Sequence, residues 1–329
     1  MITGFFSSAS CHTLKESCLR MNSLVSIPLI TYNGDRFLRY QLDSIFSQTY
    51  KNIEVIAVDD GSCDGTISIL EEFKKSHGLE IVINSHNLGY MRNFEKAVIR
   101  CRGDFIAPSD QDDIWMPDKI SRLVSEIGKK SMVCSDAIII DSQDKKISDS
   151  AFAYSSLILH PEKPFCQLLF NSSVIGCTCL FKRELIKNSF PIPEGEKYHD
   201  WWLSIVASIL DGIEYVREPL ILYRQHEQNI LGLKRIRTKV QKMFGFFRGR
   251  PDRAFFADQA KRLDVMSMLP IFNESHKQDI VMAKTYYEDR LKPGLHCRAF
   301  FIAIRMGKYI FPREPLLLRM KSVAGCLFR

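Results

Sequence analysis

The chain has 329 residues, of which 46% are hydrophobic and 25% charged, a composition typical of a globular protein with one large domain, with or without an appendage. Its ten cysteines are irregularly spaced and form no paired CxxC modules, which argues against a disulfide framework or a zinc site and favours a reducing, cytosolic compartment. The net charge of +7 is unevenly distributed: residues 232–329 carry 21 Lys and Arg against 8 Asp and Glu, whereas residues 1–231 carry 24 against 30.

The first 22 residues are predicted to form a disordered extension. Lys15, Glu16 and Arg20 interrupt the apolar character that begins at Phe5, so no apolar stretch is long enough for a signal peptide. Met21 is a candidate for a truer start of the chain. No run of about eighteen apolar residues occurs anywhere, which argues against a membrane-spanning helix.

From residue 23 the chain alternates strand-like apolar runs with helix-like stretches. Strands are predicted at 23–31 (SLVSIPLIT), 53–60 (IEVIAVDD), 80–85 (EIVINS) and 104–110 (DFIAPSD), and helices at about 35–48, 66–77 and 90–101. This alternation predicts an α/β fold with a mostly parallel, Rossmann-like sheet that has helices on both faces.

The second half is less regular. Residues 131–141 suggest a strand pair, 171–186 a loop, a strand and a helix, 199–210 a helix, and 212–229 a short strand, a turn at Pro219 and a closing strand. Beyond Gly232 the chain is basic and predicted to be mostly helical. We therefore expect an α/β domain over residues 23–231 and a basic helical region over residues 232–329.

Four polar clusters each follow a predicted strand. They are TYNGD (31–35), DDGSCDGT (59–66), HNLGYMRN (86–93) and SDQDD (109–113). Because ligands of such sheets bind at the carboxyl ends of the strands, we expect all four clusters to gather along one edge.

The cluster SDQDD has two interpretations. It is either an acidic turn that caps a helix started by Pro117 or a site for a divalent cation. Three carboxylates within four residues repel one another, and Mg²⁺ or Mn²⁺ bound among them with substrate phosphate oxygens would relieve that repulsion. The pattern favours binding of a metal and a diphosphate.

The cluster DDGSCDGT also has two interpretations. It is either a strand–helix connection capped by Asp64 or Thr66, or a loop whose Asp59 and Asp60 accept hydrogen bonds from a nucleobase or ribose. The dinucleotide fingerprint GxGxxG, the phosphate loop GxxxxGK[ST], the zinc motif HExxH and the EF-hand frame are all missing.

Two further segments are weak signals when taken alone. Asp200 in KYHDWWL could be a helix N-cap followed by core tryptophans, and His226 in YRQHEQN could be a surface histidine at a strand end.

Taken together and in order, these motifs resemble the family-2 glycosyltransferases of GT-A fold. The segments are VSIPLITYNGDRFLRYQLDSIFSQTYKNIEVIAVDDGSCDGT, NLGYMRNFEKA, SDQDDIWMPDKI, NSSVIGCTCLFKREL, HDWWL and LYRQHEQN. The resemblance covers roughly residues 24–230 and is greatest to the rhamnosyltransferase-like branch that builds bacterial surface polysaccharides.

The resemblance implies roles for individual residues. The expected nucleotide-binding residues are Thr31, Tyr32, Asn33, Asp35, Asp59, Asp60, Arg92 and Asp110, with Asp59 and Arg92 holding the base. The expected metal ligands are Asp112, Asp110 and His226, and the residues expected near the sugar or acceptor are Asp113, Gly176, Cys177 and Trp201. Asp200 matches the general base.

The implied reaction is an inverting, metal-dependent transfer that uses Mg²⁺ or Mn²⁺. The best-matching donor is dTDP-L-rhamnose; the alternatives are a UDP-hexose or UDP-N-acetylhexosamine, or an inactive nucleotide- or carbohydrate-binding assembly partner. The acceptor would be a glycan or a polyprenyl-diphosphate-linked glycan. The basic C-terminal region suits peripheral contact with an anionic membrane on the cytoplasmic side, or packing on the catalytic domain, and no nucleic-acid-binding motif accompanies it.

Overall fold

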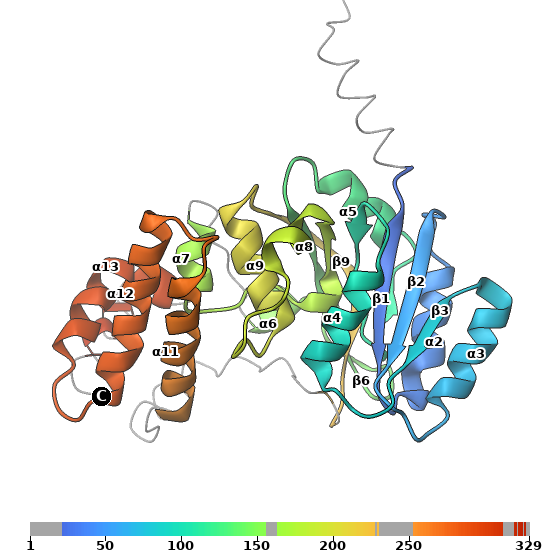
Figure 1. Ribbon diagram of the computed structural model, residues 1–329, viewed down its shortest axis with the longest axis horizontal. Helices are drawn as coiled ribbons and strands as arrows, with labels where there is room; N and C mark the ends of the chain where they lie inside the picture. The colour runs from blue at the N-terminus through green and yellow to red at the C-terminus, as the bar shows by residue number, and fades with distance from the viewer. Residues whose placement is uncertain are drawn as a thin grey trace, which may run out of the picture. The chain divides into compact units, whose positions relative to one another are not determined.

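The computed structural model describes residues 22–155, 163–227, 229, 253–311, 319–320, 322–324 and 326 (Figure 1). Nearly all of the predicted N-terminal extension therefore lies outside the described residues. Contacts divide the chain into two compact units, which we call the sheet unit (Met1–Ser150, Ile175–Lys187, Leu210–Ile230) and the helical unit (Ala151–Val174, Asn188–Ile209, Leu231–Arg329). The predicted domain boundaries at 23–231 and 232–329 stay a proposal about which parts fold independently.

The first half of the sheet unit confirms the predicted strands and helices. Strands β1 (Val25–Thr31), β2 (Ile53–Asp59), β3 (Glu80–Ile83) and β4 (Phe105–Ile106) run parallel in the order β3-β2-β1-β4. The intervening helices are α2 (Asp35–Phe46), α3 (Thr66–His77) and α4 (Tyr90–Arg100). Figure 1 shows α4 on one face of these strands and α2 on the other.

Burial of β1 and α2 explains this arrangement. Every residue of β1 is buried, as expected for a central parallel strand that is covered on both faces. Helix α2 buries one stripe of apolar side chains, including Leu38, Leu42 and Ile45, at the spacing of a helix face that packs on a core.

The sheet continues beyond β4 in the order β8-β6-β9-β5, with β7 paired to β6. These strands are β5 (Ile114–Trp115), β6 (Met132–Asp141), β7 (Lys146–Ser148), β8 (Cys179–Lys182) and β9 (Ile213–Gln225). Strand β8 is antiparallel to β4 and β6, β5 is antiparallel to β9, and β9 runs parallel to β6. The sheet is mostly parallel in extent, because its longest pairings, β1 with β2 and β6 with β9, are parallel and the antiparallel pairings are short.

Two predictions in this part were wrong. Residues 131–141 form one strand instead of a pair, and Pro219 lies within the continuous 13-residue strand β9 instead of in a turn. The register against β6 moves from Ser135↔Val216 to Asp136↔Pro219, so two residues of β9 are taken up by an irregularity beside the proline. Proline lacks an N–H group and is tolerated in a sheet at such a point.

Six helices of the helical unit lie wholly within the described residues, and residues 319–320, 322–324 and 326 are helical as well. The six helices are α6 (Ala151–Ser155), α7 (Pro164–Leu168), α9 (His199–Ile209), α11 (Arg253–Met268), α12 (Glu274–Leu291) and α13 (Cys297–Ile310). Helices α11 and α12 pack on each other, as do α12 and α13. The remaining elements are α5 (Lys119–Glu126), the 3₁₀ turn η1 (Gly176–Thr178) and α8 (Glu184–Ser189). None of the described helices is both long and apolar enough to cross a membrane.

Candidate active site

The loops after β1 and β2 are joined by hydrogen bonds. The backbone N–H of Asn33 donates to the Ser62 hydroxyl at 2.9 Å, and the Asn33 side-chain oxygen accepts from the N–H of Cys63 at 2.9 Å. Asn33 has φ +46°, a left-handed conformation that asparagine tolerates better than most residues. Asp35 makes a similar pair of contacts, donating its N–H to Asp64 and accepting from that of Gly65. The two loops therefore form one preorganised surface.

Asp59 holds the loop after β2 in place and links it to the end of β1. Its side chain is fully buried. One oxygen accepts from the N–H groups of Gly61 and Ser62, and the other accepts from the hydroxyls of Thr31, at 2.8 Å, and Ser62. Arg92 instead pairs with Glu95 at 2.8 Å. The hydrogen bonds described for Asp59 and Arg92 therefore go to different partners and not to each other. Their expected joint contact with a nucleobase stays a prediction.

Asp60 links the second loop to the third. One carboxylate oxygen accepts from the Asn84 amide and from the N–H of Leu88, both at 2.8 Å, and the other accepts from the N–H of Gly89 at 2.9 Å. Gly89 has φ +84° at the start of α4, a conformation open to glycine. Three of the four predicted clusters are therefore joined along one edge of the sheet, as the strand order predicts.

The acidic cluster joins the same edge through Gln111. Its side-chain oxygen accepts from the N–H of Tyr32 at 2.8 Å, and its amide nitrogen donates to the Tyr32 carbonyl at 3.1 Å. A Cβ atom on Gly34 would lie 2.2 Å from that side-chain oxygen, so the glycine makes room for the bridge. The Tyr32 side chain remains 48% exposed.

Asp112 and His226 meet directly, although 114 residues separate them in the sequence. Nε2 of His226 lies 2.8 Å from a carboxylate oxygen of Asp112, and Asn229 donates its amide to the same oxygen at 3.4 Å. The imidazole also packs against Phe37 of α2, with ring centroids 5.1 Å apart. The structure thus brings together two of the three predicted metal ligands.

Arg224 holds this region in place. Its guanidinium donates from Nε to the Asp112 carbonyl at 2.7 Å and from Nη1 to the Asp141 carbonyl at 3.2 Å, and Nη1 also pairs with the Asp144 carboxylate. The guanidinium carbon lies 4.5 Å from the Phe37 ring centroid. The Arg224 side chain is only 1% exposed, so these contacts form a buried clamp on the acidic loop.

Asp113, the last residue of the acidic cluster 109–113, is buried. One of its oxygens accepts from the backbone N–H of Arg224 at 3.0 Å, and the other has no hydrogen-bond partner among the described residues. Burial, with the neighbouring Asp112 carboxylate as a second cause, raises the pKa of Asp113 well above its usual range. Its expected contact with the sugar or acceptor stays a prediction.

Asp110, Asp113 and Cys177 present ligand atoms within 4.8 Å of one another. Burial raises the pKa of the Cys177 thiol well above its usual range, so the sulfur stays a neutral thiol and a poor ligand for Mg²⁺ or Mn²⁺. The two carboxylates, one with an unsatisfied buried oxygen, are the hard ligands that these ions prefer. Asp110 thus offers one such oxygen beside the buried Asp113, and Asp112 and His226 offer a carboxylate oxygen and an imidazole nitrogen. The predicted ligands are therefore of types that a divalent cation accepts.

Lys119 is a fully buried cation beside this group. Its ammonium donates to the Cys177 carbonyl at 2.6 Å and lies 3.4 Å from the centre of the Trp115 ring. Burial lowers the pKa of Lys119 to about 8. Cys177 and Gly176, expected near the sugar, are both buried in η1. The structure thus places them next to the carboxylates.

The predicted base and its neighbours belong to the helical unit. Asp200 lies in the first turn of α9, and one of its oxygens accepts from the N–H of Trp201 at 2.7 Å. Trp201 donates from its indole to the Leu168 carbonyl at 2.6 Å, and the guanidinium carbon of Arg262 lies 4.0 Å from its ring centroid. Trp201 is therefore a packed residue, and the roles of Asp200 and Trp201 in catalysis stay predictions.

The sequence interpretation missed three residues of this site: Gln111, Lys119 and Arg224. Arg224 could have been noticed, because it lies two residues before His226 and alternate residues of a strand share a face. Gln111 and Lys119 gave no comparable signal, since their partners Tyr32 and Cys177 are far away in the sequence.

Comparisons with known proteins identify the family of the chain. The model of the family described as glycosyl transferase family 2 matches residues 26–190. RfbG of Shigella flexneri, named a dTDP-rhamnosyl transferase, is 31% identical over 221 residues, covering 62% of this chain and 73% of RfbG. WfaP of Escherichia coli, named a UDP-Glc:alpha-D-GlcNAc-diphosphoundecaprenol beta-1,3-glucosyltransferase, is 30% identical over 210 residues, covering 63% of this chain and 79% of WfaP.

EpsH of Bacillus subtilis is 33% identical over 220 residues, and the match spans 62% of its length and 63% of this chain. Among solved structures, S. aureus TarS 1-349 in complex with UDP-GlcNAc aligns with a TM-score of 0.57 at 14% identity, covering 92% of this chain and 83% of the TarS chain. At this level of identity the likeness concerns the fold alone, and it confirms the predicted α/β architecture.

Proposed function

The chain belongs to glycosyl transferase family 2, and from this premise we propose that it is an inverting, metal-dependent glycosyltransferase. It would move L-rhamnose from dTDP-rhamnose to a hydroxyl of a glycan or of a polyprenyl-diphosphate-linked glycan in the synthesis of a surface polysaccharide. The observation that carries the proposal is the partly buried contact between Asp112 and His226, held by Arg224 at the edge where the strand-following loops meet.

The site residues suit a nucleoside diphosphate sugar. Tyr32, Asn33 and Asp35 lie on the preorganised loops that would receive the nucleoside, and the exposed ring of Tyr32 offers a surface for stacking. Asp110 and Asp112, with His226, would hold Mg²⁺ or Mn²⁺, which when bound neutralises charge that develops on the departing diphosphate.

Asp200 would act on the acceptor. A sugar hydroxyl has a pKa far above neutrality, so its attack on the anomeric carbon is assisted by a carboxylate that accepts the proton. A single displacement of this kind inverts the configuration at the anomeric carbon. Asp113, Gly176 and Cys177 would shape the sugar pocket beside the carboxylates.

Two relatives support different sugar donors. RfbG, named a dTDP-rhamnosyl transferase, supports dTDP-rhamnose, whereas WfaP, named a UDP-glucose-dependent enzyme, supports the second candidate, a UDP-hexose or UDP-N-acetylhexosamine. The name of WfaP also includes a diphosphoundecaprenol acceptor, which supports a lipid-linked acceptor for this chain.

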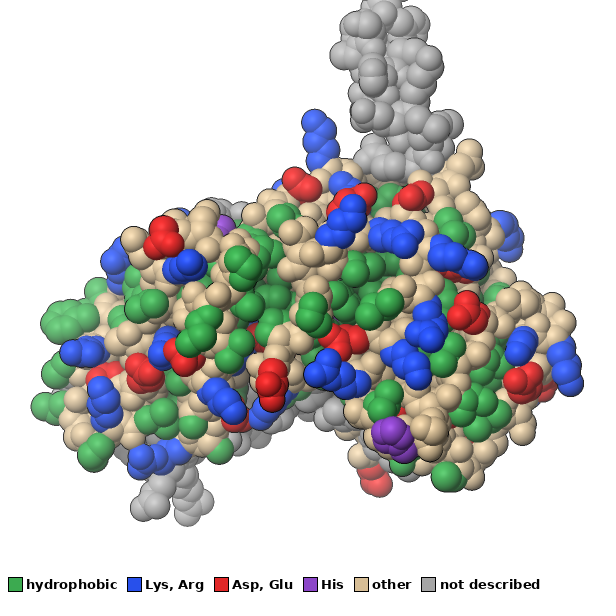
Figure 2. Space-filling view, viewed as in Figure 1, with side chains coloured by type: hydrophobic (Ala, Val, Ile, Leu, Met, Phe, Trp, Pro, Cys, Tyr) green, Lys and Arg blue, Asp and Glu red, His purple; other side chains and the backbone are tan. Residues whose placement is uncertain are grey.

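Such an acceptor implies peripheral contact with the cytoplasmic face of a membrane. Helix α13 contains no acidic residue, and its solvent-facing side chains include Phe301, 68% exposed, and Ile304, 58% exposed, beside Arg298 and Arg305. Apolar side chains interspersed with cations suit an anionic lipid surface. Figure 2 shows hydrophobic side chains beside Lys and Arg over the helical unit, together with acidic ones, so we assign the contact to α13 rather than to the whole unit.

The test is donor turnover by the purified chain. We would measure release of nucleoside diphosphate from dTDP-rhamnose, UDP-glucose and UDP-GlcNAc in the presence of Mn²⁺, Mg²⁺ or EDTA. We expect metal-stimulated release from dTDP-rhamnose, abolished by Asp112→Asn and retained in Asp149→Asn, a control whose side chain is 79% exposed. Nucleotide binding without release from any donor would contradict the enzymatic proposal and favour a binding protein.

A further inference from the structure

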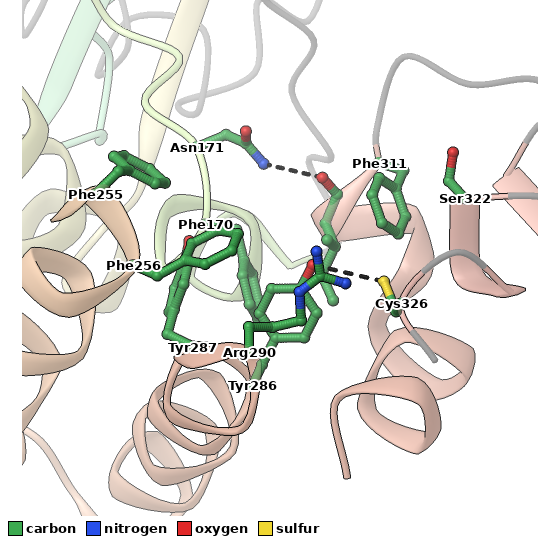
Figure 3. A pocket seen from close by; sticks show the side chains of 11 residues that line it. Phe170, Asn171, Phe255, Phe256, Tyr286, Tyr287, Arg290, Phe311, Ser322 and Cys326 are labelled. Atoms are coloured by element: carbon green, nitrogen blue, oxygen red, sulfur yellow. Dashed lines mark hydrogen bonds between the residues drawn. The ribbon is translucent and has the colours of Figure 1, made fainter. Parts of the chain in front are cut away.

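The helical unit contains a cavity of about 380 Å³ that the proposed transfer reaction does not use (Figure 3). It is formed by helices α11 and α12, the end of α13 and the segment that follows α7. Its volume lies within the range of about 300–1,000 Å³ that is typical of small-molecule sites. The cavity is therefore large enough to receive a ligand.

Aromatic rings form most of the cavity wall. Phe170, Tyr286 and Tyr287 are each at most 6% exposed and contact one another, with ring centroids 5.4–5.9 Å apart. Phe256 packs on Tyr287 at 5.8 Å, and Phe255, 42% exposed, packs on it at 6.2 Å. Because the rings support one another, the apolar wall is preformed and suits a hydrocarbon group.

Among the described residues that line the cavity, the one cation is Arg290, from the last turn of α12. Figure 3 shows its guanidinium directed into the same space as the rings. Its Nε is buried without a hydrogen-bond partner, and no carboxylate of the described residues forms an ion pair with it. The guanidinium carbon lies 5.5 Å from the ring centroid of Phe256.

An unsatisfied buried guanidinium N–H is costly, and a phosphate oxygen is a partner that arginine binds well. None of the residues that line the cavity is acidic, so nothing in the described wall would repel an anion. The chemistry of the cavity thus combines an apolar wall with one anion-binding group.

We propose that this cavity binds a prenyl phosphate, with the isoprenoid chain among the aromatic rings and the phosphate at Arg290. The choice of an isoprenoid rests on the proposed polyprenyl-linked acceptor, whereas the apolar wall and the cation are features of the helical unit itself. Ile310, at the end of α13, lines the cavity, so the cavity adjoins the helix whose exposed side chains include Phe301, Ile304 and Arg305.

The test uses the full chain and three soluble probes in isothermal titration calorimetry: farnesyl phosphate, farnesol and inorganic phosphate. We expect farnesyl phosphate to bind about tenfold or more tightly than farnesol, because it adds a charge-assisted hydrogen bond to Arg290. Inorganic phosphate should bind weakly, since it lacks the chain that fills the apolar wall. Equal affinity for farnesol and farnesyl phosphate, or tight binding of inorganic phosphate alone, would overturn the proposal.

Two variants separate the two parts of the site. Arg290→Met should remove the preference for farnesyl phosphate over farnesol, and Phe255→Ala should weaken both ligands alike. Phe255 is partly exposed, so its truncation carries little risk for folding. Arg217→Met, at an exposed arginine of strand β9 in the sheet unit, should bind like the wild type, and thermal unfolding would confirm that each variant is folded.

Dodecyl phosphate serves as a fourth probe that tests the isoprenoid part of the proposal. If it binds as tightly as farnesyl phosphate, the site recognises any alkyl phosphate and the assignment to prenyl chains falls. Release of nucleoside diphosphate by the same preparation reports separately on the proposed transfer reaction. Intact release without farnesyl phosphate binding would refute this inference and leave the proposed function standing.

Discussion

Replacement of Arg224 by methionine tests whether the buried clamp positions the metal-binding loop. Arg224→Met keeps an apolar side chain but removes the guanidinium, which lies over the Phe37 ring and donates to the carbonyls of Asp112 and Asp141. The carbonyl of Asp141 keeps the N–H of Asp144 as a donor at 3.2 Å, so the main loss is the hydrogen bond to the partly buried Asp112 carbonyl. A polar group that loses its partner costs about 1–3 kcal/mol, so we expect the free energy of unfolding to fall by about that amount. The pairing with Asp144 adds little, because that carboxylate is 63% exposed.

The same change should also weaken metal binding, because it frees the backbone of Asp112. Loss of a residue that orients a metal ligand typically lowers metal affinity about 10–100-fold. We would measure Mn²⁺ affinity by titration in the presence of nucleotide, and stability by urea unfolding at the same pH. Arg224→Lys keeps the charge but loses the planar fork, so it should recover little of either quantity.

Arg262 provides the matched control. It is also a buried arginine stacked on an aromatic ring, Trp201, and it pairs with Glu196 at 2.8 Å, but it lies in the helical unit. Arg262→Met should destabilise the chain and leave the Mn²⁺ affinity of the folded protein unchanged. The reasoning would be refuted if Arg224→Met kept wild-type Mn²⁺ affinity, or if both variants lost affinity to the same extent.

Three further changes test other parts of the molecule. Asp200→Asn should lower sugar transfer by about 10²–10⁴ while the nucleotide dissociation constant stays nearly unchanged, and retained transfer would exclude Asp200 as the base. Gly34→Ala should displace the Gln111 side chain and break its two hydrogen bonds to Tyr32, so nucleotide affinity should fall, and combining it with Gln111→Ala should add little further loss. Burial lowers the pKa of His199 to about 3, below its ordinary value of 6.5. Because the folded state then binds the proton less well than the unfolded state, stability is lost as the pH falls from 6.5 towards 3. Protonation of His199 therefore lowers the free energy of unfolding by about 2 kcal/mol at pH 5. In urea unfolding at pH 7.5 and at pH 5, His199→Gln should reduce the difference between the two free energies by about that amount. A difference that stays the same in His199→Gln would contradict this role of His199.

Predictions from sequence succeeded where the signal is local. The alternation of apolar strands and amphipathic helices depends on neighbouring residues, and β1, β2 and α2 appear within a few residues of their predicted ranges. The turn expected at Pro219 failed because pairing with β6 on one side and β5 on the other keeps β9 extended, and a register irregularity accommodates the proline. Long-range strand pairing overrode a local turn preference.

For the site, the sequence by itself determined which chemistry is available, because the carboxylates of SDQDD follow a strand of a parallel sheet and must lie at its ligand-binding edge. The tertiary structure decided which groups meet there. Asp112 contacts His226 across 114 residues, Arg224 clamps the loop from β9, and Asp113 is buried rather than exposed. Hydrogen bonds and burial of this kind depend on how distant strands pair, and nothing in the local sequence specifies them.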